Sequence, residues 1–171
     1  MRKIRVSIGE IGKAAKEIER LRNQIEVRTR EFLTKLLQAG VAIASAKIYE
    51  MSAIEAGELD SSICYLISSD GKHGIVRADS RHAAYVEFGT GVLGQNNPHP
   101  TMPWAYDVNG HGNSGWWYPC SPESPNPIKW QADDGSWWAW TKGMPSRPFM
   151  FETAKELSEQ CKETAQEVFG L

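Results

Sequence analysis

The segment 92–142 constrains the fold most, because it concentrates residues that regular helices do not tolerate. It holds all seven Trp and seven of the nine Pro residues of the chain, with Gly and Asn between them. This density of Pro excludes a regular helix across the segment, yet so much aromatic surface is not expected to stay disordered in water. A structured loop or β-hairpin is therefore expected. Its arms would be 115–118 and 136–140, with a turn at 133–135 just before the second arm.

Helical periodicity lies on both sides of this segment. From about Glu10 onward, apolar residues recur at 3- and 4-residue spacing, which predicts one long helix or two helices joined by a bend. Gly40 marks either the bend or a close packing contact. A second stripe predicts a C-terminal helix with Pro148 in its first turn. The first stripe comprises Ile11, Ala15, Ile18, Ile25, Phe32, Leu36, Ala39 and Ile43, and the second comprises Met150, Ala154, Leu157, Cys161, Ala165 and Val168.

Short β-strands are expected between the first helical region and the Trp-rich segment. Residues 56–59, which include Gly57, should end the helical region. Residues 62–67 and 73–78 are short segments that contain β-branched and aromatic residues, and the Asp-Gly pair at 70–71 predicts a tight antiparallel hairpin. Residues 83–88 supply a third strand or a short helix, which the glycines at 89 and 91 would stop. Residues 4, 6 and 8 weakly indicate a strand or an extended arm.

The expected fold is therefore α+β, with a long N-terminal helical segment and a C-terminal helix packed on a small antiparallel sheet. A chain of 171 residues suits one domain, here 1–171 with the insert 92–142. The net charge of −2 argues against a strong polyanion binder. Charge is uneven, however, since residues 1–30 are basic and residues 148–171 acidic. This asymmetry predicts head-to-tail pairing, intramolecular pairing or a basic lining near DNA, and two solvated helix faces are the alternative.

Localisation follows from apolar runs and cysteines. The N-terminus lacks the apolar run of a secretory signal, and no stretch is long enough to span a bilayer. The odd number of widely spaced cysteines, three, argues against a disulfide framework. We therefore expect a protein made and kept in a cytosol, with no membrane partner.

Several short strings resemble binding or catalytic motifs but lack the sequence context that those motifs require. Residues 110–115 match Gly-x-Gly-x-x-Gly, yet no helix follows that would bind a pyrophosphate, so a loop is the better interpretation. His99, His111 and Cys120 lack the paired spacing of zinc ligands. Cys120 has no nucleophile elbow or oxyanion donors around it. We expect no catalytic, cofactor-binding or metal-binding residues, and hence no enzyme.

Two short motifs carry the strongest indication of function. Residues 82–91 read His-Ala-Ala-Tyr-Val-Glu-Phe-Gly-Thr-Gly, and residues 143–150 read Gly-Met-Pro-Ser-Arg-Pro-Phe-Met. The order of helix, short strands, first motif, aromatic insert, second motif and helix resembles the tail-completion (neck) proteins of long-tailed double-stranded DNA bacteriophages. The resemblance spans nearly the whole chain, although the insert is longer and richer in Trp than is expected for that family.

The resemblance implies fold and assembly roles for specific residues. The acidic position of the family falls on Glu87, for which the sequence offers Arg77 and Arg81 as default ion-pair partners. The Trp pairs of the insert are expected either at a protein interface or in a small core of their own, and less often as a platform that stacks sugars or bases. The family positions are Tyr85, Glu87, Phe88, Gly89, Gly91, Pro148 and Phe149, and the Trp pairs are Trp116, Trp117, Trp137 and Trp138.

The function implied by the resemblance is structural. The chain would be a virion protein that assembles as a ring of identical subunits, six-fold order being one option, between the head connector or head-closure protein and the tail terminator or tail tube. DNA would pass through the lumen without specific binding, which the modest net charge suits. The alternatives are a tail terminator or another minor head-tail component, or, in a different class, a Trp-rich carbohydrate- or nucleic-acid-binding module.

Overall fold

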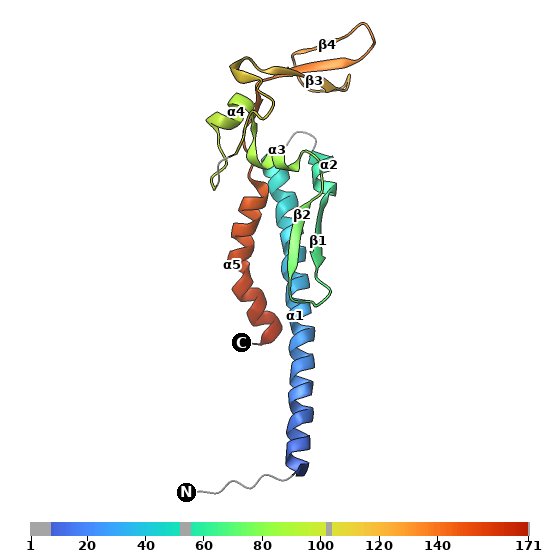
Figure 1. The fold of residues 1–171 in the computed structure, drawn as a ribbon, viewed down its shortest axis with the longest axis vertical. Helices are drawn as coiled ribbons and strands as arrows, with labels where there is room; N and C mark the ends of the chain where they lie inside the picture. Colours follow the sequence, from blue (N-terminus) through green and yellow to red (C-terminus); the bar gives the residue numbers. More distant parts are fainter. Residues whose placement is uncertain (1–7, 52–55, 102–103, 171) are drawn as a thin grey trace.

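The computed structural model describes residues 8–51, 56–101 and 104–170. It is an α+β fold with two small antiparallel sheets, and it is elongated, with α1 extending along most of its length (Figure 1). In chain order the elements are α1 (Ile8–Glu50), α2 (Ala56–Ser61), β1 (Ile63–Ile67), β2 (Gly74–Ala78), α3 (Ala83–Phe88), α4 (Gly91–Asn96), the 3-10 turn η1 (Gly112–Ser114), β3 (Trp116–Cys120), β4 (Lys129–Gln131), β5 (Trp137–Thr141), β6 (Gly143–Met144) and α5 (Phe149–Phe169).

The two long helices pack side by side and run in opposite directions (Figure 1). Two ion pairs cross between them, Lys35 Nζ to Glu167 Oε1 at 2.6 Å and Lys47 Nζ to Glu156 Oε2 at 3.7 Å. The acidic C-terminal region thus forms ion pairs with α1, and the charge asymmetry predicted such pairing with residues 1–30. The lysines it meets, however, lie beyond the basic first 30 residues.

Helix α1 is continuous, so the alternative of two helices joined by a bend is wrong. Gly40 is buried, and a Cβ placed there would lie 2.8 Å from Leu157 and 2.9 Å from Val76. Gly40 is therefore a packing contact at which α5 and the hairpin both approach α1. The deepest α1 side chains lie beside the predicted stripe and not on it, and they are Leu37, Ala44 and Ile48.

The predicted hairpin is confirmed. Strands β1 and β2 pair antiparallel, from Ile63 opposite Ala78 to Ile67 opposite Gly74, and Gly71 adopts a positive φ of 68° in the turn. The hairpin lies along α1 (Figure 1). Residues 83–88 form helix α3, so the third-strand alternative is wrong.

The core gathers where the C-terminal part of α1 meets α2, β1, α3 and the start of α5. Its buried members are Ala44, Ile48, Leu59, Ile63, Ala83, Val86 and Phe149. Residues 56–59 contribute Leu59 from a separate helix, α2, whereas α1 already ends at Glu50. The expectation that these residues close the first helix is therefore wrong, because α2 starts a new helical turn that packs on the core. The expected arm at residues 4, 6 and 8 falls mostly outside the described residues, and Ile8 itself begins α1.

The Trp-rich insert forms its own sheet at the end of the molecule that is remote from the start of α1 (Figure 1). The two predicted arms are confirmed as β3 and β5, which pair antiparallel from Trp116 opposite Thr141 to Cys120 opposite Trp137. Strand β4, absent from the sequence-based description, pairs with the other edge of β5. Helix α4 lies at the start of the insert, before the first Pro at 98, and corrects the expectation that the insert holds no helix.

Candidate functional site

The carboxylate of Glu87 links the two motifs. It lies on α3 with 7% of the residue exposed, and it accepts hydrogen bonds from the first turn of α5. The Met150 N–H donates to Oε2 at 2.8 Å and the Phe151 N–H donates to Oε1 at 2.9 Å. The first N–H groups of a helix lack intrahelical partners and attract negative charge. Glu87 therefore caps α5 from a distant point in the chain.

Pro148 occupies the N-cap position of α5 and makes no side-chain capping bond, so the helix begins one residue later than the first-turn placement predicted. The expected ion pair of Glu87 with Arg77 or Arg81 is wrong. Arg77 instead pairs with Asp79 at 2.9 Å. The buried carboxylate finds its partners in backbone N–H groups and a histidine, because these already converge at the start of α5.

His99 is the side chain that completes this junction. Its Nε2 lies 3.1 Å from Glu87 Oε1, and its Nδ1 accepts from the Thr101 N–H at 3.3 Å. Because a backbone N–H can only donate, Nε2 is the nitrogen that carries a proton toward Glu87. The sequence offered His99 only as a zinc candidate, and no local spacing connects it to Glu87.

Aromatic rings close the junction on its outer side. The Phe88 ring stacks on Trp104 at 4.5 Å between centroids and lies 4.6 Å from the His99 ring. The Trp104 Nε1–H donates to the Gly89 carbonyl at 3.1 Å. These contacts attach the beginning of the insert to the first motif. Tyr85, by contrast, points outward and is 49% exposed.

The two glycines of the first motif allow the second motif to approach closely. Gly89 and Gly91 both have positive φ, at 81° and 57°. A Cβ on Gly89 would lie 2.7 Å from the Ser146 backbone nitrogen, and a Cβ on Gly91 would lie 2.5 Å from the Lys142 carbonyl oxygen. Antiparallel bridges join residues 90 and 91 to 144 and 143. Any side chain at either position would force the two motifs apart.

The Trp sheet presents its rings on two faces. Residues directly opposite in antiparallel strands share a face, and alternate residues lie on opposite faces. Each predicted Trp pair is therefore divided between the faces. One face, called the Trp face here, comprises Trp117, Pro119, Trp130, Trp138 and Trp140, and the other face carries Trp116, Tyr118, Trp137 and Ala139.

The two faces differ in how their aromatic rings are packed and in how much of each ring is exposed. Trp116 is half-buried and stacks on His111 at 4.5 Å, and Trp137 lies under Lys129 Nζ at 5.7 Å from the ring centroid. On the Trp face, Trp117 and Trp130 are 45% and 49% exposed. Their rings meet edge to face, 6.4 Å apart with an interplanar angle of 86°. The Trp face is thus the larger exposed aromatic surface of the sheet.

The Gly-x-Gly-x-x-Gly string at 110–115 folds around Asp107 as a loop that includes the 3-10 turn η1. The His111 and Gly112 N–H groups donate to its two carboxylate oxygens at 2.8 and 2.7 Å. These bonds, that from Gly112 foremost, hold the pKa of Asp107 below its usual range. The N–H groups that a phosphate would need are thus engaged by a side chain of the protein itself. No group of three His, Cys, Asp or Glu side chains suited to a metal ion lies within the described parts of the chain.

Comparisons of the chain with protein-family models, with curated proteins and with solved structures gave no match. Among the residues that the structure describes, none of the helices combines the length and apolarity that a membrane span requires.

Proposed function

We propose that this chain is a structural protein of the neck of a long-tailed bacteriophage, a tail-completion subunit that joins the DNA-filled head to the tail. It acts by assembly into a ring of identical subunits between the head connector and the tail. In this proposal the chain has no catalytic role.

The observation that carries the proposal is the junction between the two motifs. The resemblance rests on two short motifs about 50 residues apart, and chance matches would have no reason to meet in space. Here Glu87 of the first motif caps α5, which begins within the second motif, and Gly89 and Gly91 lie against residues 142–146. The Ser146 hydroxyl also donates to the Glu87 carbonyl at 2.6 Å. His99 and Trp104, at the start of the insert, also contact the first motif and so belong to this junction.

The outer surfaces then supply the contacts of the ring. Tyr85 on α3 and the Trp face of the insert expose aromatic rings near one end of the molecule. Exposed Tyr and Trp bury much area with few rotatable bonds, so they are favoured at the centres of protein interfaces. We assign the Trp face to contact with a neighbouring virion protein, either the head-closure protein or the tail terminator.

Two other functions give different expectations. A tail terminator or another minor head-tail component would use the same fold at a neighbouring level of the particle. A carbohydrate- or nucleic-acid-binding module would stack ligand rings on the Trp face. The edge-to-face arrangement of Trp117 and Trp130 disfavours this module, because one flat ligand ring cannot stack on both.

Inactivating the gene in its phage and examining the lysate by electron microscopy tests the proposal. A neck protein predicts DNA-filled heads and complete tails that remain separate, with virions restored when the chain is supplied from a plasmid. Tails of uncontrolled length would indicate a tail terminator instead. A lysate of normal virions would refute the proposal.

A further inference from the structure

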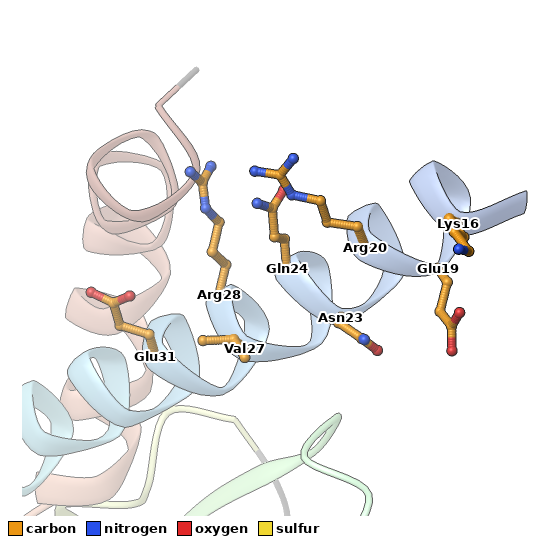
Figure 2. Close-up of a pocket in the computed structure, with 8 residues that line it drawn as sticks. All are labelled: Lys16, Glu19, Arg20, Asn23, Gln24, Val27, Arg28 and Glu31. Carbon is orange, nitrogen blue, oxygen red and sulfur yellow. The ribbon is translucent and has the colours of Figure 1, made fainter. Parts of the chain in front are cut away.

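The first half of α1 extends beyond every element that packs on its second half. Helix α5 ends beside Arg28, whose guanidinium donates to the Phe169 carbonyl at 3.0 Å, and the Phe32 ring contacts the Phe169 ring. Figure 2 shows α1 continuing past this point, with Arg20, Gln24 and Arg28 extending from it. Every residue from 8 to 28 is exposed. About 30 Å of helix, at 1.5 Å per residue, thus lies outside the packed part of the molecule.

This exposed helix carries a regular apolar stripe. Ile11, Ile18, Leu21 and Ile25 follow one another at intervals of seven, three and four residues, and all four side chains are exposed. A further seven residues lead to Phe32, which contacts α5. The stripe therefore continues the α5-facing side of α1 beyond the end of α5. Between Ile18, Leu21 and Ile25 it forms a shallow groove.

The spacing is that of a coiled-coil seam. In a seven-residue repeat lettered a to g, Ile11, Ile18 and Ile25 occupy a positions and Leu21 occupies a d position. Ile at a with Leu at d suits a parallel pair of helices. Most of the stability of helices in proteins comes from packing an apolar face, so this exposed part of α1 gains stability when its stripe is covered. We infer that residues 8–28 of α1 pack in parallel and in register against the same segment of a second copy of this chain.

Charge at the edges of the stripe favours this occupant and this orientation. Glu10 and Glu17 lie on one edge (g positions), and Arg22 lies on the other (an e position). In a parallel pair a g residue faces the e residue five positions later on the other helix, so Glu17 meets the partner's Arg22. In an antiparallel pair like edges face each other, and Glu17 lies against the acidic edge.

Forming this contact costs little within the single chain. Arg22 donates to Glu26 of its own helix at 3.0 Å, and both side chains are mostly exposed. Exposed pairs of this kind contribute little stability, so Arg22 can exchange Glu26 for the partner's Glu17. The inference is independent of the neck function. The two are compatible, because rotation about an axis along α1 leaves the helices of neighbouring copies parallel.

Sedimentation equilibrium of the full chain tests the pairing. The unmodified protein should self-associate, and Ile18→Lys should weaken association by roughly tenfold or more, because it places a charge in the seam. Asn23→Lys is the matched control, since it adds the same charge about 140° around the helix. It should associate like the unmodified protein. A chain that stays monomeric at its highest soluble concentration would overturn the inference, as would equal association of the two variants.

Charge reversal tests the orientation without touching the apolar stripe. Glu17→Arg and Arg22→Glu should each weaken association, and the double variant should restore it. If Glu17→Arg alone strengthens association, the helices are antiparallel and the in-register inference is wrong. Circular dichroism of each variant, measured at the same concentrations, separates loss of pairing from loss of the helical core.

Discussion

The Glu87 junction and the Trp face use aromatic and polar residues in opposite ways. At the junction, each oxygen of the Glu87 carboxylate accepts a backbone N–H bond, and Phe149 beneath it is 1% exposed. On the Trp face, Trp117 and Trp130 leave nearly half of their surface open to solvent. The comparison indicates that the junction holds the fold together, whereas the Trp face leaves two rings open to solvent, as the interface that we propose requires.

The largest effect is expected from Phe149→Ala. Its ring fills the core where α1, α2, α3 and α5 meet, so its removal should cost about 3 to 5 kcal/mol of unfolding free energy. Urea denaturation followed by circular dichroism measures this loss. A loss of about 0.5 kcal/mol or less, which is typical of substitutions at the surface, would show that the junction does not hold the fold.

Glu87→Gln should cost less, about 1.5 to 3 kcal/mol, because it weakens charged hydrogen bonds while keeping the side-chain shape. The amide can accept at one oxygen only, whereas the carboxylate accepts from Met150, Phe151 and His99. Glu152→Gln, in the same first turn of α5, is the control and should change stability by about 0.5 kcal/mol or less. Equal losses in the two variants would mean that burial of Glu87 adds nothing.

The smallest expected effect is the loss of stability at low pH that follows from protonation of Asp107. The Gly112 and His111 N–H groups hold the pKa of Asp107 below its ordinary value. Its stabilising contribution is therefore present above the ordinary pKa of Asp and is lost as the pH falls through the lowered pKa. The amide resonances of His111 and Gly112 should shift in that acid range. In Asp107→Asn they should not shift, and a persistent shift would assign the transition to another group.

Local signals predicted much of the fold from the sequence. The Asp-Gly turn at 70–71 gave the hairpin, and the C-terminal stripe gave α5. Strand β4 was missed because three residues, Lys129–Gln131, are too few to show alternation. The stripe of α1 predicted a helix correctly, but periodicity does not reveal what covers it, and its first half is exposed.

The candidate site was less predictable, because its contacts are distant in sequence. The motifs pointed to Glu87 but suggested the nearby arginines as partners. Its observed partners are His99 and the N–H groups of residues 150 and 151, which only the folded chain brings together. The division of each Trp pair between two faces follows from strand alternation. Which face is more open depends on how the sheet sits on the rest of the molecule.

The double variant Trp117→Ser with Trp130→Ser tests the separation between junction and Trp face most directly. Its thermal unfolding and its ability to complete virions in the gene-deficient phage are measured together, with Val108→Ser as a control at another exposed apolar residue. The account predicts that the double variant keeps nearly the melting temperature of the unmodified chain but fails to complete virions. Val108→Ser should keep the melting temperature and also complete virions. A fall in melting temperature comparable to that of Phe149→Ala, with virion completion retained, would contradict it.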